Sequence, residues 1–348
     1  MKWKSMKAMF TLTIIFIIIL SCLSGCVQQS HSDDNSINSN YVNFQDSLGN
    51  NITLPKTAER IIAINSNAAE MLIAIGAKDK IVGLSSTGMN DRLLSTNLPD
   101  ARSIGSWMNP SVEDIITLEP DVLICYSSHK PRNIDQLIAA NITMIFMDCY
   151  RLDSLAKDAR ALGVLTGNEA KAEEYARFQE KYIGTITEKT ETLTDKPDVY
   201  FETMATFTAV SPGSGGDILI NMSGGRNIAD NGTASTQKVS AEWVIKQNPD
   251  VILKVWNGNE TMDELKIAYD ELTVRTGMPE IEAVNKDRVY IIHDDIAFGP
   301  RGAVGLSYVA KILHPELFPE LDPDSINKEY AGKFIGGVTT GAYIYPEP

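Results

Sequence analysis

Short apolar runs that alternate with helical segments constrain the fold of this chain most strongly. Arg60–Asn65 has the pattern of a buried strand, Ala68–Ile75 that of a helix closed by Gly76, and Lys80–Leu84 that of the next strand. Further apolar runs of the same kind are Asp121–Tyr126, Thr143–Asp148, Val199–Glu202, Val251–Val255 and Val289–His293. Because strands separated by helices pair in parallel, we expect an α/β protein with parallel sheets and helices on their faces.

One segment of the sequence occurs twice. Ser111–Ile124 matches Ser240–Leu253 at Ser, Glu, Ile, Pro, Asp and Val. Each copy is expected to form a helix that is capped by its serine, ended by proline and followed directly by a strand. The repeat predicts two Rossmann-like lobes on one plan. Between the copies, Asn168–Leu193 has apolar residues at helical spacing, which predicts one helix about 40 Å long that joins the lobes.

The first residues of the chain are typical of an export signal. Three lysines precede the apolar run Ala8–Leu20, and Leu23–Cys26 resembles a lipoprotein signal in which the Cys26 thiol is lipidated. A membrane anchor that is never cleaved is the alternative. Under either reading the folded part lies outside the cytoplasm, tethered to the outer face of the cytoplasmic membrane.

The sequence therefore predicts six consecutive parts. They are a signal peptide (1–25), a flexible tether (26–40), an N-terminal lobe (41–166), a connecting helix (167–195), a C-terminal lobe (196–335) and a tail (336–348). The formal net charge of −14 becomes −17 when the signal peptide, with three lysines and no acids, is removed. Such an excess of acids argues against nucleic acid as a partner, because phosphates require surplus Lys and Arg.

Motifs of the common catalytic sites are missing from the sequence. There is no nucleophile elbow, HExxH, P-loop or dinucleotide fingerprint, so we expect a binding protein and not an enzyme. The four histidines are too scattered for a metal cage, although His129 and His293 could face a cleft; no metal and no cofactor is predicted. Cys125 and Cys149 end predicted strands, and we slightly favour a disulfide over two free buried thiols or a soft metal site.

Ligands of open α/β sheets bind beyond the carboxyl ends of the strands. The residues at such positions that we predict to bind the ligand are Asn65, Ser66, Trp107, Tyr126, Tyr150, Arg151, Phe207, Trp256 and Arg301, and Phe298 lies nearby. Aromatic rings and guanidinium groups suit a bulky, flat, partly anionic ligand. A packing role is the alternative for each of these residues.

Six loose motifs in a fixed order give the chain a family resemblance. They are Arg60–Glu70, Gly105–Asp114, Glu119–Ile124, Gly224–Ala229, Val239–Glu242 with Asn248–Ile252, and Asp287–Tyr290 through Gly299–Arg301 to His314–Phe318. In these motifs the chain resembles the substrate-binding lipoproteins of ABC importers for iron-siderophores, haem and cobalamin, whose two lobes are joined by one long helix. The resemblance implies that Glu113 and Glu242 pair with arginines of the permease. The alternative is that each acid merely stabilises the first turn of its helix.

The resemblance also implies a function. It predicts a monomeric receptor that captures an iron(III) chelate between its lobes and delivers it to an ABC permease with its cytoplasmic ATPase. Trp107 and Tyr126 stand where cobalamin binders carry ligand-facing aromatics, whereas Thr236 replaces an aromatic wall of those proteins. A corrinoid or haem receptor is therefore the alternative, and a surface-adhesive lipoprotein is a third possibility. The acidic excess is expected to serve the permease face and not the ligand.

Overall fold

The structure is a computed structural model that describes residues 41–348 except 230, 233, 260 and 338–340. The predicted signal peptide, tether and lipidated Cys26 lie outside the described residues. The contacts divide the chain into Met1–Asn40 and Tyr41–Pro348, and everything below concerns the second unit. No helix within the described residues is both long enough and apolar enough to cross a membrane.

The first sheet is parallel throughout. Among the described residues it has five strands in the order β5-β4-β3-β8-β9. Its strands are β3 (Ile61–Ala63), β4 (Ile81–Leu84), β5 (Arg102–Ser103), β8 (Val122–Cys125) and β9 (Met144–Phe146). Successive residues of β3 and β8 enter two separate apolar clusters, one on each face of the sheet. Burial on both faces explains why these strands are continuous apolar runs in the sequence.

Seven helices of the described residues surround this sheet and form, with it, the N-terminal lobe. They are α2 (Ser66–Ala74), η1 (Lys78–Lys80), α3 (Ser86–Asn90), α4 (Arg92–Asn97), α5 (Val112–Thr117), α6 (Ile134–Ala139) and α7 (Leu155–Thr166). Two hairpins, β1 (Val42–Gln45) with β2 (Asn51–Leu54) and β6 (Gly105–Ser106) with β7 (Asn109–Pro110), complete the lobe. The predicted cap is confirmed, since the Ser111 hydroxyl accepts the backbone N–H of Asp114 at the start of α5.

The second sheet is mixed. Its order within the described residues is β13-β11-β10-β14-β15-β16, with β12 also paired to β10. The strands are β10 (Asp198–Glu202), β11 (Thr208–Val210), β12 (Arg226–Asn227), β13 (Thr236–Lys238), β14 (Val251–Trp256), β15 (Val289–His293) and β16 (Ile344–Tyr345). Strands β12, β10, β14 and β15 are parallel, as predicted, but β11, β13 and β16 run antiparallel to their neighbours. The connection from β10 to β11 is too short for a parallel crossover, so it forms a hairpin instead.

The C-terminal lobe consists of this sheet and the helices around it. They are α9 (Gly215–Met222), α10 (Ala241–Gln247), α11 (Met262–Thr273), η2 (Met278–Glu280), α12 (Glu282–Asn285), α13 (Asp294–Ala297), α14 (Gly302–Leu313) and α15 (Pro323–Phe334). Ser240 caps α10, as predicted. The repeated sequence forms α5 with β8 in one lobe and α10 with β14 in the other. The repeat therefore covers one helix–strand unit. Outside this unit the two sheets differ in the order and direction of their strands.

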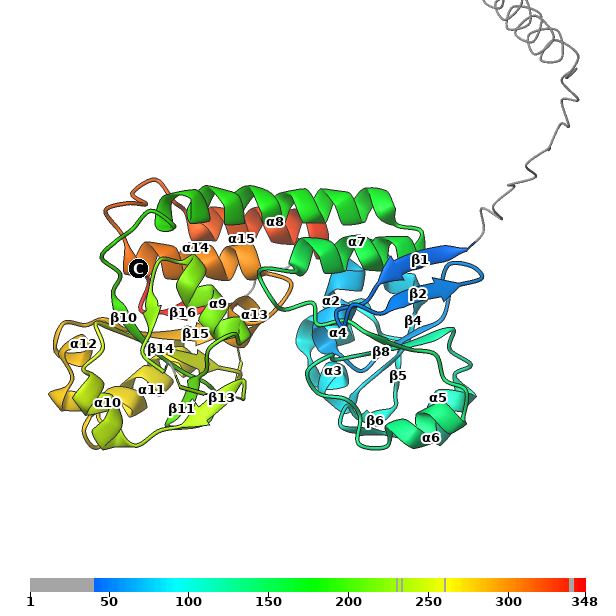
Figure 1. Ribbon diagram of the computed structural model, residues 1–348, viewed down its shortest axis with the longest axis horizontal. Helices are drawn as coiled ribbons and strands as arrows, with labels where there is room; N and C mark the ends of the chain where they lie inside the picture. Colours follow the sequence, from blue (N-terminus) through cyan, green and yellow to red (C-terminus); the bar gives the residue numbers. More distant parts are fainter. Residues whose placement is uncertain (1–40, 230, 233, 260, 338–340) are drawn as a thin grey trace, which may run out of the picture. The chain divides into compact units, whose positions relative to one another are not determined.

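The long helix predicted between the repeats is α8 (Glu169–Thr190). Its 22 residues span about 33 Å, less than the expected 40 Å because the chain turns after Thr190. Figure 1 shows α8 running beside α7, α14 and α15. Tyr175 donates its hydroxyl to the Pro300 carbonyl at 2.5 Å, and the Gln179 amide donates to the same oxygen at 2.8 Å. The long helix thus holds the turn that leads into α14.

Aromatic side chains form the contact between α8 and α15. The rings of Tyr175 and Phe178 on α8 pack against Tyr330 and Phe334 on α15, with centroids 5.4 to 6.3 Å apart. All four side chains are buried. Edge-to-face pairs of this kind add to the free energy gained by burial alone.

The favoured disulfide is wrong for this structure. Cys125 and Cys149 are both free and buried. Cys125 lies in the apolar cluster on one face of the first sheet, whereas Cys149 lies in the cluster on the other face. Since the sheet separates the thiols, they cannot bond without moving the backbone. Burial raises the pKa of Cys125 to about 12 and also raises that of Cys149.

Close packing of α7 on α8 gives a prediction. A Cβ atom on Gly163 would lie 2.5 Å from the Ala172 Cβ, whereas one on Gly184 of α8 would meet nothing within 4 Å. Gly163→Ala should lower the free energy of unfolding by about 1–3 kcal/mol, because the helices must separate. Gly184→Ala, the matched control, should raise it by up to about 1 kcal/mol. Urea unfolding measures the free energy of unfolding of both variants. An equal increase from the two substitutions would contradict the close packing of α7 on α8.

Candidate ligand cleft

A cavity of about 730 Å³ lies between residues of the two lobes. The N-terminal lobe lines it with residues of α2, α3, the start of α4 and the end of β8, and the C-terminal lobe with residues that follow β10, β14 and β15. Its described lining residues are Ser66, Asn67, Glu70, Thr87, Asn90, Asp91, Arg92, Tyr126, Met204, Asn257, Gly258, Asn259, Thr261, His293, Asp294, Asp295 and Phe298. Most of them lie beyond the carboxyl end of a strand, as the general rule for α/β sheets predicts.

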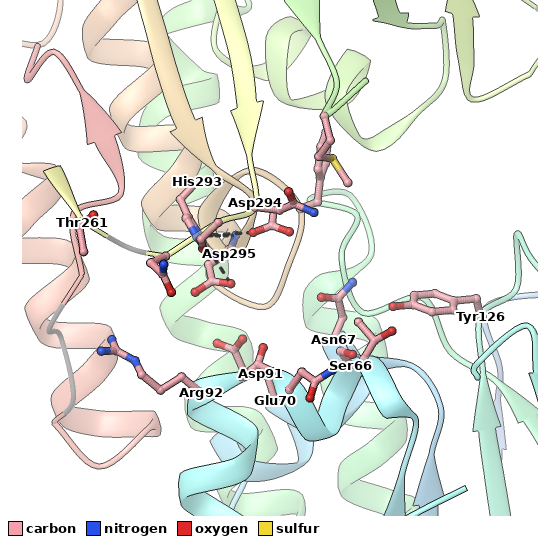
Figure 2. Close-up of a pocket in the computed structure, with 17 residues that line it drawn as sticks. Ser66, Asn67, Glu70, Asp91, Arg92, Tyr126, Thr261, His293, Asp294 and Asp295 are labelled. Carbon is pink, nitrogen blue, oxygen red and sulfur yellow. Dashed lines mark hydrogen bonds and ion pairs between the residues drawn. The ribbon is translucent and has the colours of Figure 1, made fainter. Parts of the chain in front are cut away.

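Four of the described lining residues are acids. Glu70 and Asp91 come from the N-terminal lobe, and Asp294 and Asp295 come from the turn after β15. Figure 2 shows these side chains pointing from the two lobes into the same space. Among the described lining residues, Arg92 is the single Lys or Arg side chain. The cleft therefore offers hydrogen-bond acceptors and negative charge, so part of the acidic excess lies there as well as on the surface.

Local structure fixes the turn that carries two of these acids. The His293 side chain is buried, and its Nδ1 accepts the backbone N–H of Asp295 at 3.3 Å, so it caps α13. Its Nε2 donates to the Gly258 carbonyl at 3.1 Å. The Asp294 carboxylate lies 3.3 Å from Nδ1. His293 thus joins the ends of β14 and β15 and orients the acids that follow it.

Crowding of acids raises their proton affinity. Burial, the nearby Asp295 charge and the Asp91 charge raise the pKa of Glu70 to about 7, although the Arg301 guanidinium opposes this shift. Burial likewise raises the pKa of Asp294 to about 6 and raises that of Asp91. Glu70 and Asp294 therefore take up protons as the pH falls through about 7 and about 6.

Four residues noted in the sequence line the cavity: His293, described above, and Ser66, Tyr126 and Phe298. Ser66 begins α2, and Tyr126 follows β8. Phe298 follows α13 and stacks on Phe201, with centroids 5.8 Å apart. Burial raises the pKa of Tyr126, so its hydroxyl stays protonated and can donate a hydrogen bond.

Two further predicted residues lie beside the cavity without being among its described lining. Asn65 is fully buried and caps α2 with its side-chain oxygen. Its side-chain NH2 donates to the Met147 carbonyl at 2.5 Å and to the Asp148 carbonyl at 3.1 Å. Trp107 is half-buried and packs edge-on against Tyr126, with centroids 5.5 Å apart. His129 packs on the other side of Trp107 at 6.0 Å.

Tyr150 and Arg151 contact the C-terminal lobe. The Tyr150 ring lies against Gly215, and Arg151 donates to the Gly213 carbonyl at 2.9 Å. The guanidinium of Arg151 also forms an ion pair with Asp153 at 3.0 Å. Its charge is therefore already matched by a carboxylate.

The remaining predicted residues belong to the C-terminal lobe and do not appear among the described lining residues. Phe207 donates its backbone N–H to Glu202 at 2.9 Å, and its ring lies 5.3 Å from the Arg275 guanidinium. The Trp256 ring packs against Gly258, and its buried Nε1 has no partner within the described residues. Arg301 is buried and forms ion pairs with Glu70 at 2.8 Å and Asp295 at 3.0 Å.

Sequence reasoning missed the acids of the cleft. Asp294 and Asp295 stand directly after the predicted strand Val289–His293, so the strand-end rule could have found them. His293 itself is a residue that the sequence analysis allows to face a cleft, and it lines the cavity. Asp91 caps the short helix α4 between two strands, and no sequence pattern marks it as a cleft residue. Glu70 lies inside a predicted helix, where it would ordinarily be taken for a surface charge.

A family model matches most of the folded chain. The model, described as "Periplasmic binding protein", matches residues 61–296. The chain belongs to this family. A relative from Bacillus subtilis, named as an uncharacterized ABC transporter substrate-binding lipoprotein, is 26% identical over 86% of this chain and 95% of its own length. As a member of the periplasmic binding protein family, the chain is a substrate-binding protein of an ABC transporter.

Two other comparisons bear on the ligand and on the fold. A protein of Halobacterium salinarum named as a cobalamin-binding protein is 29% identical over 64% of this chain and 61% of its own length. The crystal structure of a TroA-like periplasmic binding protein from Veillonella parvula superposes with a TM-score of 0.71 at 22% identity, covering 87% of this chain and 99% of that one. The predicted α/β fold with a long helix is therefore confirmed.

The raised pKa of Glu70 gives a prediction about this periplasmic binding protein. The folded state holds the Glu70 proton up to about pH 7, whereas the ordinary value is 4.5. The free energy of unfolding should therefore fall as pH rises through this window, because the folded state binds more protons than the unfolded state. Glu70→Gln should remove about 1–3 kcal/mol of that decrease.

Denaturant unfolding between pH 4.5 and pH 8 measures this effect. Glu188→Gln, at an exposed position of α8, is the control and should keep the decrease of the original chain. The pKa values of Asp294 and Asp158 are also raised, to about 6. Both variants should therefore still show a smaller decrease in the free energy of unfolding as the pH rises toward 6. An unchanged pH profile in Glu70→Gln would contradict the assignment.

Proposed function

We propose that this substrate-binding protein captures a corrinoid in the cleft between its lobes and delivers it to an ABC permease. The observation that carries the proposal is the acceptor-rich lining, with Glu70, Asp91, Asp294 and Asp295 around the cavity. A corrinoid is a flat macrocycle whose edge carries primary amides, and amide N–H groups are donors that suit carboxylates. The named function of the Halobacterium salinarum relative supports the same ligand class.

The charge distribution disfavours the partly anionic ligand that the sequence suggested. Arg301 is buried between two carboxylates, and Arg151 is paired with Asp153. A ligand with exposed carboxylates would meet several acids of like sign in a partly desolvated cleft, which is unfavourable. The neutral corrin amides avoid this repulsion.

An aromatic edge supports a flat ligand. Tyr126 lines the cavity, Trp107 packs edge-on against Tyr126, and His129 packs edge-on against Trp107. Thr236, which replaces an aromatic residue of cobalamin binders, lies exposed on β13 and is not among the described lining residues. Its identity therefore has little bearing on the floor of the cleft.

An iron(III) chelate is the second candidate. A chelate that carries protonated amines would also match the carboxylates, since it brings donors and positive charge. Haem is less well matched, because its propionates would face the acids. The test must therefore separate ligands by charge as well as by shape.

Ligand-dependent stabilisation tests the ligand class. Cyanocobalamin and dicyanocobinamide should raise the unfolding temperature of the chain from Tyr41 onward, because a ligand at a hundred times its Kd adds about 2.7 kcal/mol. Ferric citrate and haemin, which carry carboxylates, should leave it unchanged. A rise with a cationic ferric hydroxamate alone would select the second candidate. A rise with ferric citrate and none with the corrinoids would reject the proposal.

Docking on the permease is proposed for Glu113 and Glu242. Both are exposed in the first turn of a Ser-capped helix, one in each lobe. Hydrogen bonds from its own backbone N–H and from the Ser240 hydroxyl lower the pKa of Glu242, so it is charged at neutral pH. Two matched acids at equivalent helix starts could pair with arginines on two permease subunits. We also propose that a lipid on Cys26 holds the monomer at the membrane.

Charge reversal tests the docking proposal. Glu113→Lys together with Glu242→Lys should abolish ligand-dependent stimulation of the transporter ATPase, because like charges would then face each other. The Kd for cyanocobalamin should stay within about twofold, since neither residue lines the cleft. Glu188→Lys, also exposed, is the control and should retain stimulation. Loss of ligand affinity in the double variant would sink the assignment.

A further inference from the structure

Arg301 occupies a position that its predicted role does not explain. Its residue is 2% exposed, and it is absent from the described lining of the cavity. The guanidinium Nε donates to Glu70 at 2.8 Å, and one terminal nitrogen donates to Asp295 at 3.0 Å and to the Tyr343 hydroxyl at 3.1 Å. The arginine therefore lies behind the cleft, and its two carboxylate partners lie in front of it.

The two carboxylates come from opposite sides of the cleft. Glu70 projects from α2 of the N-terminal lobe, and Asp295 belongs to α13 of the C-terminal lobe. Both line the cavity. One planar guanidinium with several donors can hold two carboxylates at fixed positions, which a single ammonium on a flexible stem cannot do equally well.

The arginine is itself held from several directions. Tyr175 and Gln179 of α8 bind the Pro300 carbonyl next to it, and the Ala303 backbone N–H donates to Gln179 at 3.0 Å. The Tyr343 ring lies 5.5 Å from the guanidinium carbon. Tyr330 of α15 donates its hydroxyl to Glu70 at 3.1 Å. These contacts leave the side chain little freedom to reach a ligand.

We propose that Arg301 is a positioning residue of the ligand cleft: it fixes Glu70 and Asp295 as a pair of acceptors, one from each lobe, without contacting the ligand. The inference rests on the proposed function in one respect, namely that the ligand presents donors to these carboxylates. Without the guanidinium the two acids would repel each other, and Glu70 would keep its proton to higher pH. A protonated Glu70 would lose much of its capacity as an acceptor.

Several charged and titratable groups surround this pair. Asp91 caps α4, and Arg92 is its first residue. Next to Asp295 are His293 and Asp294. Three tyrosines complete the set: Tyr175 of α8, Tyr330 of α15 and Tyr343 in the segment before β16. The acids favour the protonated form of Glu70, and Arg301 favours its charged form. Removal of the Arg301 charge should therefore raise the pKa of Glu70.

Substitution of the arginine tests the proposal with two independent measurements. In Arg301→Lys and Arg301→Gln, the Kd for dicyanocobinamide should rise at least tenfold at pH 7, and the pH at which affinity reaches half its maximum should move upward. Arg177→Lys, at an exposed ion pair of α8, is the matched control and should change neither quantity. Equal affinities and pH profiles in Arg301→Lys and the original chain would overturn the proposal.

The second measurement needs no ligand. Carbon-13 NMR of the Glu70 carboxyl should give a pKa near 7 in the original chain and a clearly higher value in Arg301→Gln, which removes the positive charge. Tyr343→Phe, which removes one hydroxyl and retains the ring, should fold even if the arginine variants do not, and should show a smaller shift in the same direction. An unchanged Glu70 titration in the folded variants would overturn the proposal. Failure of the original chain to bind any corrinoid would reject the proposed function, while this titration would still decide the role of Arg301.

Discussion

The buried guanidinium of Arg301 is the interaction on which the geometry of the cleft depends. It neutralises part of an acidic cluster that would otherwise be costly to bury, and it does so between carboxylates from both lobes. Helix α8 fixes the backbone beside it through Tyr175 and Gln179. The long helix therefore does more than join two lobes. By holding the Pro300 carbonyl, it also fixes the position of the Arg301 guanidinium, which pairs with carboxylates of both lobes.

The acids of the cleft and the exposed acids of α5 and α10 lie in different surroundings. Glu113 and Glu242 lie at helix starts on the surface, where their charge is screened by water. Glu70, Asp91 and Asp294 lie where water is scarce, so their pKa values rise. Burial therefore distinguishes the acids of the cleft, because it raises their affinity for protons.

Much of the fold could be predicted from the sequence because buried parallel strands leave continuous apolar runs, as β3, β8, β14 and β15 do. The serine caps of α5 and α10 were equally readable, since the capping side chain is local. The antiparallel strands β11, β13 and β16 could not be predicted, because each has only two or three residues, too few to show a pattern. In the cleft, Ser66 and Tyr126 follow strands and could be located, whereas Glu70 and Asp91 acquire their positions from contacts far along the chain. Arg301 was noticed, but its partners depend on tertiary packing that no spacing reveals.

The last part of the chain completes the cleft. Tyr330 donates to Glu70, and Tyr343 accepts from Arg301, while β16 pairs with the strand that carries His293. Since a ribosome makes these residues at the end of synthesis, the earlier carboxylates have no settled partners until the chain is nearly finished. A chain that ends after β15 would keep the parallel strands of both sheets but lack Asp295, Arg301, Tyr330 and Tyr343, so Glu70 would have none of the partners described above.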